Sequence, residues 1–436
     1  MHQQIQQLVA LAVVIYLVTA LIVRARWPWI PVWAIMALSS FIMVITGIVP
    51  IDDLGSAIDL NVVLFLIGMF SLVSLAESSG LLGSIASAIL YKVRDTGVLL
   101  YVFSLLFGVL SAIAVNDTVA LMGPSIAYSL AKTAGYNPEA VFILLAFSIT
   151  IGSVMTPMGN PQNVLIAIQS GIAAPFIQFI KYLAIPTLIN LFVTTYIVKK
   201  IYMVDPEILE LSAVPRERVI NRRDALLASI GLSSAVAALV INDIFELAGL
   251  PHISERGFIP FIIAAGIYIF SSNPRKTLAS VDWGTIVFFI TMFITMEGIW
   301  RSGVLLPLLG LLITQRLGDI EGILAISGIS IALSQILSNV PFTKLFIQYM
   351  HSLGYGEADT DLWITLAMAS TIAGNLTLLG AASNIIILEA LESKFGITIS
   401  FTRFLRVGSI VTASNLAIYI PAIYIAHRYI TLPASI

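Results

Sequence analysis

Long apolar segments, separated by short polar ones, occupy most of the chain. A helix needs about 20 apolar residues to cross a lipid bilayer, so these segments predict membrane-spanning helices. Two of the longest segments, 138–170 and 361–390, contain polar interruptions, and we predict that they are broken helices. We predict uninterrupted spans at residues 8–23, 30–49, 60–79, 183–200, 225–245, 257–272, 283–300 and 407–427.

Two more segments, 97–133 and 321–351, consist of two apolar arms around a polar tip, at 115–118 and 338–341. Each could be two spans or one re-entrant hairpin. The basic residues decide, because Lys and Arg concentrate on the cytoplasmic side of a membrane. If both segments are re-entrant hairpins and both termini lie outside, most basic residues fall inside. The outer loops then hold only Lys181, Arg256, Arg301, Arg316 and Arg428.

The composition agrees with a membrane protein. Of the 436 residues, 58% are hydrophobic and 11% are charged, whereas a soluble domain has about 25% charged residues. The sequence therefore predicts an all-α polytopic protein of the cell membrane, with about 10 transmembrane helices plus two re-entrant hairpins. The net charge of −2 gives no sign of a nucleic-acid partner. Without Cys, and without an HExxH or GxSxG motif, the sequence does not indicate an enzyme.

The second half of the sequence repeats the first. Polar and aromatic residues of one predicted span return in the same order and spacing in another, so that Asp59, Phe65 and Phe70 become Asp282, Phe288 and Phe293. We predict a first repeat at 1–204, a cytoplasmic linker at 205–224 and a second repeat at 225–436. Each half crosses the membrane an odd number of times, so the second copy should be inverted and the hairpin tips should meet near the midplane.

The two broken helices share a motif. Thr156, Gly159 and Asn163 correspond to Thr377, Gly380 and Asn384. Asn160 precedes Pro161, which disfavours a helical conformation for Asn160, while Pro161 suits the first turn of a new helix. We predict breaks at 157–161 and near 378–383. Bare peptide groups at membrane depth occur only where they line a cavity, and secondary transporters bind their ligands at such breaks.

Asp117, at the first tip, is the strongest functional candidate, because a charge inside the membrane is energetically unfavourable. As a purely structural residue it would cap a helix starting at Thr118. With Asn116 and the carbonyl groups of the first break it could instead bind a hard cation such as Na⁺, or it could carry a proton. The predicted ion-binding residues are Asn116, Asp117, Thr118, Thr156, Gly159 and Asn160, with Na⁺ placed at Asn116, Asp117 and Gly159.

The second half offers a matching polar cluster without a carboxylate. Lys344 follows its tip, and this lysine could extend to the membrane surface, hold an anion or pair with Asp117. We interpret Glu77 and Glu297 as residues that face water or cap helices. The predicted residues for the substrate or a second ion are Asn163, Ser338, Asn339, Lys344, Thr377, Gly380, Ser383 and Asn384.

Several of these motifs resemble a known family. The sequence Asn116-Asp117-Thr118-Val119-Ala120-Leu121, followed by Pro124, resembles the first hairpin of the arsenite permease (ArsB) group. Gly159-Asn160-Pro161-Gln162-Asn163 resembles the broken helix of the ion transporter superfamily, which includes the divalent anion:sodium symporters and the YbiR-like permeases. The resemblance implies two inverted repeats, two hairpins, binding sites at the tips and breaks, and alternating access by a transport domain that moves against a scaffold.

We interpret the chain as an ion-coupled secondary active transporter of a small anion, with Na⁺ or H⁺ as the coupling cation, no cofactor other than a bound Na⁺, and a homodimer as a candidate assembly. The related dicarboxylate symporters have Ser-Asn-Thr at both tips, whereas this chain has Asn116-Asp117-Thr118 and Ser338-Asn339-Val340, which favours the ArsB/YbiR-like branch. An arsenite or antimonite efflux permease and a Na⁺/H⁺ antiporter are alternatives. A channel is a further alternative, against which the two inverted broken-helix repeats argue.

Overall fold

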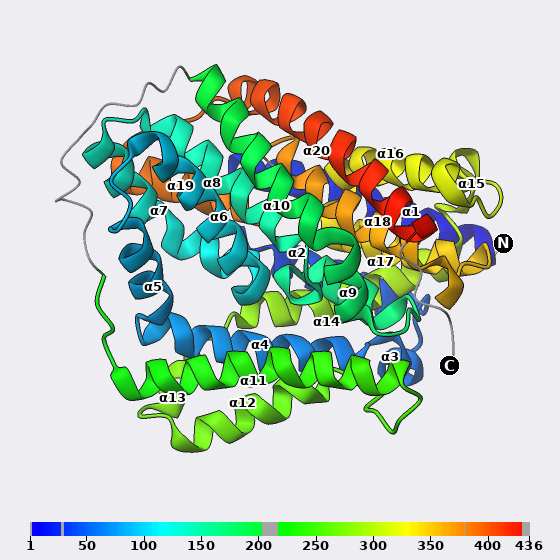
Figure 1. The fold of residues 1–436 in the computed structure, drawn as a ribbon. Coiled ribbons are helices and arrows are strands. Elements are labelled where there is room, and N and C mark those ends of the chain that lie inside the picture. The colour runs from blue at the N-terminus through cyan, green and yellow to red at the C-terminus, as the bar shows by residue number, and fades with distance from the viewer. Residues whose placement is uncertain (1, 28–29, 203–216, 379, 430–436) are drawn as a thin grey trace.

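The computed structural model describes residues 2–27, 30–202, 217–378 and 380–429, and every regular element in these ranges is a helix (Figure 1). Eight of the described helices are long and apolar enough to cross a membrane. The prediction of an all-helical, multi-pass membrane protein is therefore confirmed. The eight are α1 (His2–Arg26), α4 (Leu60–Ser78), α6 (Thr96–Ala114), α10 (Pro175–Ile201), α11 (Arg222–Leu247), α14 (Trp283–Ser302), α16 (Asp319–Leu337) and α20 (Phe401–Tyr429).

Two predicted spans are shorter than the sequence indicated. The span predicted at 30–49 is α2 (Val32–Ile45), of 14 residues, and the span predicted at 257–272 is α12 (Phe258–Phe270), of 13 residues. Pro31 is extended, so the apolar residues before α2 do not join the helix. At 1.5 Å per residue α2 is about 21 Å long, less than the ~30 Å of a hydrocarbon core. Four short helices also occur, α3 (Leu54–Ala57), α5 (Leu81–Leu90), α13 (Pro274–Ala279) and α15 (Leu306–Leu312).

Each predicted hairpin is a pair of helices joined by a single residue. In the first, α6 joins α7 (Asn116–Ala134) at Val115, and in the second, α16 joins α17 (Asn339–Ser352) at Ser338. Val115 and Ser338 have φ angles of 63° and 67°, a region that costs a non-glycine residue about 1–3 kcal/mol. The same strain therefore occurs at the same point of both hairpins. α6 and α16 have 19 residues each and are about 28 Å long, nearly the thickness of a hydrocarbon core. Their length fits a full span as well as an arm of a re-entrant hairpin, so re-entry stays a prediction.

Both predicted broken helices are broken. The first consists of α8 (Pro138–Ser153), a 3₁₀ turn η2 (Pro157–Gly159) and α9 (Pro161–Gln169), and the second of α18 (Thr360–Ile372), η4 (Ala373–Asn375) and α19 (Ala382–Phe395). The second break begins before the predicted 378–383. Its two ends cross closely, since a Cβ on Gly374 would lie 2.9 Å from the Cβ of Ala381. Gly374 lies before the predicted bounds of the break, and its lack of a side chain permits this close crossing.

The helices of the two halves follow one order along the chain. The series from α1 to α10 corresponds, helix by helix, to the series from α11 to α20. Asp59 and Asp282 both cap their helices, with Oδ1 accepting from Val62 N at 3.2 Å and from Thr285 N at 3.0 Å. This parallel supports the predicted duplication. Of the predicted linker, residues 205–216 lie outside the described residues, and α11 begins at Arg222 because Asn221 caps it.

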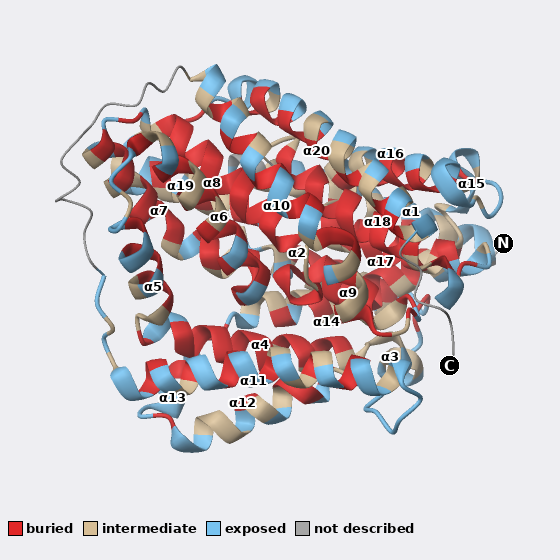
Figure 2. Ribbon diagram, viewed as in Figure 1, coloured by how far each residue is buried: buried red, intermediate tan, exposed pale blue. Residues whose placement is uncertain are grey.

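The helices form two groups. The outer group consists of α1, α2, α4, α11, α12 and α14, and the inner group consists of the hairpins, the broken helices, α10 and α20. α4, α11 and α12 pack together along one edge, and α14 packs on α2 and α1 (Figure 1). The hairpins and broken helices pack on one another, and α10 packs on α20 beside them. Figure 2 shows that burial is greatest in α8, α17 and α18, whereas α11 and α12 carry many exposed residues. The first arms of both broken helices, α8 and α18, therefore lie in the interior of the protein.

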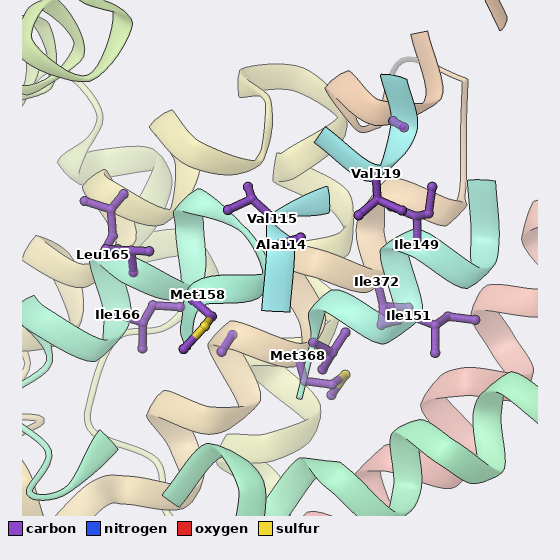
Figure 3. Close-up of a cluster of buried hydrophobic side chains, with 14 of the residues drawn as sticks. Ala114, Val115, Val119, Ile149, Ile151, Met158, Leu165, Ile166, Met368 and Ile372 are labelled. Atoms are coloured by element: carbon purple, nitrogen blue, oxygen red, sulfur yellow. The ribbon is translucent and has the colours of Figure 1, made fainter. Parts of the chain in front are cut away.

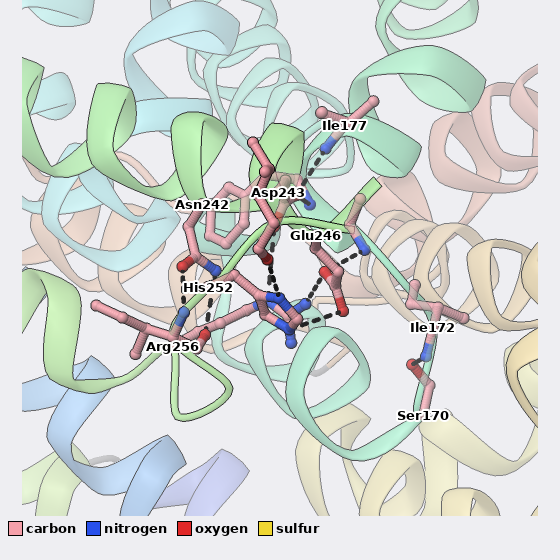
Figure 4. A network of polar contacts seen from close by, with 12 residues as sticks. Ser170, Ile172, Ile177, Asn242, Asp243, Glu246, His252 and Arg256 are labelled. Atoms are coloured by element: carbon pink, nitrogen blue, oxygen red, sulfur yellow. Dashed lines mark hydrogen bonds and ion pairs between the residues drawn. The ribbon is translucent and has the colours of Figure 1, made fainter. Parts of the chain in front are cut away.

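Acidic side chains of α11 hold the beginning of α10. Asp243 is fully buried, and its Oδ2 accepts from the backbone N of Phe176 at 2.7 Å and of Ile177 at 3.1 Å (Figure 4). Glu246 accepts from Ala174 N at 2.8 Å. Arg256 is paired with both carboxylates. Carboxylates at the start of a helix satisfy its free N–H groups and interact favourably with its dipole.

We predict that Asp243→Ala lowers the free energy of unfolding by about 3 kcal/mol, because it leaves two buried N–H groups and Arg256 without this acceptor. Thermal unfolding in detergent measures the effect. Glu255→Gln is the matched control, since Glu255 is exposed in the loop before Arg256, and should change stability by less than about 0.5 kcal/mol. Equal unfolding temperatures for the two variants would contradict the role given to Asp243.

Candidate functional site

One cavity joins the two hairpin tips and the two breaks. Its volume is about 430 Å³, within the range of small-molecule binding sites. The tip of the first hairpin contributes Val115, Asp117 and Thr118, and the tip of the second contributes Ser338 and Val340. The first residues after the breaks, Pro161 of α9 and Ala382 of α19, complete this part of the wall. Elements more than 200 residues apart in the sequence therefore meet at one space.

The first tip is held in place by apolar packing. Ala114, Val115 and Val119 lie buried among side chains of the broken helices, with Ile149 and Ile372 close by (Figure 3). Such packing can maintain the left-handed conformation of Val115, which would otherwise be unfavourable. The tip is thus positioned by both halves of the protein.

The charges of the cavity wall are mainly negative. Glu77, Asp117 and Asp282 line it together with Arg24. Asp282 is engaged as the cap of α14, with its carboxylate bonded to the N and Oγ1 of Thr285. Asp117 makes no hydrogen bond or ion pair to any described residue. A cation is therefore favoured in this cavity over a lone anion.

The helix-capping alternative for Asp117 is wrong. The helix begins at Asn116 rather than at Thr118, and Val115 is its capping position, without a side-chain bond. Asp117 is instead half-buried in the first turn of α7, where the helix dipole favours a negative charge. Its carboxylate faces the cavity and is available to a ligand.

Asn116 and Asn339 occupy equivalent places just after the two strained residues. Both side chains are buried, and the amide oxygen of each has no hydrogen-bond donor. Buried polar atoms nearly always have partners, so each oxygen marks a place where an ion or water is expected. Neutral oxygen atoms of this kind are suitable ligands for a hard cation.

The first break is closed by its own amides. Asn163 Nδ2 donates to Ser153 O at 3.1 Å and to Thr156 O at 3.0 Å. Asn160 Nδ2 donates to Ser153 O at 3.2 Å and to Thr371 Oγ1 at 3.1 Å. Thr371 Oγ1 in turn donates to Asn163 Oδ1 at 3.3 Å. Both amides are thus engaged in holding the break, which leaves few free ligand atoms.

Thr156 and Gly159 also shape the first break. Thr156 Oγ1 donates to the carbonyl oxygen of Ala112, just before the first tip. A Cβ on Gly159 would lie 2.2 Å from Ser153 O, so a larger residue cannot be placed there without moving the backbone. Among the residues predicted to bind the ion, these two, with Asn160, have structural contacts in this conformation.

The second break has free oxygen atoms. Asn384 Nδ2 donates to Gly374 O at 2.7 Å and to Thr377 O at 3.3 Å, as Asn163 does in the first half. However, Asn384 Oδ1, Ser383 Oγ and Asn375 Oδ1 are buried and have no hydrogen-bond partner among the residues that the structure describes. A Cβ on Gly380 would lie 3.0 Å from the Cα of Gly374, so Gly380 permits the close crossing. The second break is therefore the better supplied with ligand atoms.

Gln335 is a site residue that the sequence analysis missed. It lines the cavity, accepts from Thr377 Oγ1 at 2.8 Å and donates to Ala373 O at 2.9 Å. It thereby joins the second hairpin to the second break. A polar residue three positions before Ser338, inside an apolar arm, was the available signal. Asn375 was also missed, although the motif Gly374-Asn375 precedes Thr377.

Lys344 does not pair with Asp117. Its side chain is buried, Nζ donates to Gln169 Oε1 at 3.0 Å, and Nζ lies 5.5 Å from the ring centre of Phe293. The carboxylates that interact with its charge are Asp59 and Glu297. The prediction of a pair with Asp117 is therefore wrong, because the sequence does not show which helix faces α17, whereas extension of Lys344 towards the membrane surface stays a prediction.

An all-helical membrane protein with a cavity between two hairpin tips and two broken helices has the architecture of a secondary transporter. The chain belongs to the CitMHS family, described as citrate transporter, whose model matches residues 14–373. The resemblance to the ion transporter superfamily is confirmed, and the protein is a transporter rather than an enzyme.

Relatives and a solved structure agree. The chain is 26% identical to an uncharacterized transporter of Mycobacterium bovis, with 86% of this chain and 88% of the relative covered. It is 24% identical to the putative transporter arsB of Dictyostelium discoideum (88% and 85% covered) and 24% identical to the silicon efflux transporter LSI3 of Oryza sativa subsp. japonica (81% and 83%). The Alcanivorax borkumensis YdaH transporter shares the fold, with a TM-score of 0.54 at 13% identity over 86% of this chain and 87% of that chain.

The contrast between the bonded and the free amides can be measured. We predict that Asn163→Ala lowers the free energy of unfolding by about 2–3 kcal/mol, since it leaves buried carbonyl groups without donors. Asn339→Ala is the control, because its amide oxygen has no partner to lose, and its effect should be at most about 1 kcal/mol. Thermal unfolding of both variants in detergent measures the difference, and a larger loss for Asn339→Ala would contradict this assignment.

Proposed function

We propose that this CitMHS family member is an ion-coupled secondary active transporter of a small anion, with the cavity as the binding site and alternating access as the mechanism. The observation that carries the proposal is that both hairpin tips and the first residues after both breaks, Pro161 and Ala382, line one space. A transport domain of hairpins and broken helices that moves against the outer helices would expose such a space to each side of the membrane in turn. With the N-terminus outside, as the basic residues predict, the cavity of this conformation opens to the cytoplasm.

The charge of the cavity gives a physical reason for coupling. With Asp117 and Glu77 ionised, a lone anion is repelled, since two unit charges 4 Å apart interact by about 4 kcal/mol at an effective dielectric constant of ~20. A Na⁺ or H⁺ bound first removes much of this repulsion. The anion then binds well only when the cation is present, and the two cross the membrane together.

Oxygen atoms without partners among the described residues support two candidate positions for the cation, both next to the residues that line the cavity. Asn339 Oδ1, Asn384 Oδ1 and Ser383 Oγ are free in the second half, and Asn116 Oδ1 lies next to Asp117 in the first. We assign the coupling cation to one or both of these groups. In the first half the carboxylate of Asp117 can accept Na⁺ or H⁺. In the second half neutral oxygens can coordinate Na⁺ but cannot retain a proton at neutral pH.

The names of the matched proteins suggest small, oxygen-rich substrates. The family model is described as a citrate transporter, and two relatives are named for an arsB transporter and for silicon efflux. Hydroxyl and amide groups around the cavity, with the N-termini of α7, α17 and α19 beside it, can donate hydrogen bonds to such a solute. Arsenite or antimonite efflux is the second candidate, supported by the arsB relative and by the first tip.

We predict that Asp117→Asn lowers ion-driven uptake into proteoliposomes at least about tenfold, because the cavity loses the carboxylate at the first hairpin tip. Uptake of citrate, arsenite and silicate is measured with an imposed Na⁺ gradient and, separately, a pH gradient. Asp52→Asn is the control, since Asp52 is exposed and does not line the cavity.

Unchanged coupled uptake in Asp117→Asn would remove Asp117 from the mechanism. A Na⁺-driven pH change inside the vesicles without any added anion would support a Na⁺/H⁺ antiporter instead. Currents far above the turnover of a carrier would support a channel.

A further inference from the structure

A network of polar side chains lies at the ends of α4 and α14 that are remote from the cavity. The cavity touches Phe70 and Glu77 of α4 and Asp282 and Phe289 of α14. The polar network lies at the other ends of these helices, near Asp59 and Glu297. Since Asp59 and Glu77 lie 18 positions apart in the sequence, they are about 27 Å apart along the helix axis. The cavity therefore separates the helices at one end of α4 and α14, and the polar network joins them at the other end.

We define the Lys344 network as Lys344 and Gln348 of α17, Gln169 of α9, Asp59 at the start of α4 and Glu297 of α14. Lys344 Nζ donates to Gln169 Oε1 at 3.0 Å, and Gln169 Nε2 donates to Asp59 Oδ2 at 2.7 Å. Gln348 Nε2 donates to Glu297 Oε2 at 3.0 Å. These hydrogen bonds link α17 and α9 to the start of α4, and α17 to α14.

The two halves differ in these contacts. At the Lys344 network, α17 packs on α14 and α9 packs on α4. In the order of the repeat, the corresponding pairs are α7 with α4 and α19 with α14. The cavity lies between the members of these corresponding pairs, since all four helices contribute to its wall. The contacts made on one face are thus replaced by open space on the other.

Individual residues follow the same rule. Lys344 lies over the ring of Phe293. In the repeat, Phe293 corresponds to Phe70, and Lys344, six positions after Ser338, corresponds to Leu121, six positions after Val115. Phe70 and Leu121 both line the cavity, on α4 and α7. Phe70 and Leu121 would come into contact if the cavity closed in the way that brings Lys344 onto Phe293 at the other end of the helices.

We infer that the Lys344 network is the closed gate of the transporter, and that Phe70 and Leu121 form the counterpart gate, which closes when Lys344 leaves Gln169. The inference rests on the proposed alternating access. Lys344 is then a gating residue and not part of the anion site.

Lys344→Gln tests the gate. The variant removes the positive charge that faces Asp59, and with it the donor to Gln169, whereas Glu297 keeps its ion pair with Arg301. The closed gate should therefore become less stable relative to the open one. The chain has no Cys, so a single reporter, Ile385→Cys on the cavity wall, can be labelled with a membrane-impermeant maleimide from the face to which the cavity opens. In proteoliposomes we expect labelling to slow about fivefold in Lys344→Gln, as molecules shift to the conformation with a closed cavity.

Gln348→Glu is the second variant, which places a carboxylate against Glu297 and leaves Lys344 in place. It should slow labelling in the same direction. Lys276→Gln is the control, since Lys276 is exposed on α13 away from the network, and its rate should equal that of the parent. Labelling within twofold of the parent in both gate variants overturns the inference.

Flux measured on the same preparations separates the two proposals. A parent protein without ion-driven anion uptake, but with labelling that responds to both gate variants, contradicts the proposed function and leaves the gate in place. Ion-driven uptake together with unresponsive labelling contradicts the gate and leaves the function in place.

Discussion

Backbone groups that leave a helix inside a membrane must find partners within the protein, because lipid offers none. In this chain, side-chain amides meet that requirement. Asn163 donates to carbonyl groups of the first break, and Asn384 donates to carbonyl groups of the second. Without these bonds the extended segments would carry unsatisfied groups at membrane depth. These hydrogen bonds to the backbone make the two breaks possible. The tips that pack against the breaks, and the cavity between them, depend on the same bonds.

The two halves use the same elements for different tasks. In the first half the amides of Asn160 and Asn163 are bonded to the break and to Thr371, so this break is a closed structural unit. In the second half the oxygens of Asn375 and Asn384 are free. A duplicated architecture can thus hold one rigid and one ligand-accepting break. Together with the negative wall of the cavity, this asymmetry supports the proposal that a cation and an anion depend on each other for binding.

Local sequence predicted the elements well where a residue acts on its own backbone. Pro161 begins α9 as expected, and Asp59 and Asp282 begin α4 and α14. Prediction was weaker where a distant contact sets the boundary. The second break starts at Ala373, because Gly374 lets its two ends cross, and no neighbouring residue in the sequence reports that crossing.

The sequence by itself determined that this chain is a multi-pass helical membrane protein, that it contains two tips and two breaks, and that Asp117 is an unusual charge. Hydropathy, proline geometry and the energetic penalty of a charge in lipid are local properties, so they can be read from the chain. Only the tertiary structure decided that the tips and breaks share one cavity and that Lys344 meets Gln169 on the far side of it. Those facts depend on which helices pack together, and packing joins residues far apart in sequence through shape and burial, which no local pattern specifies.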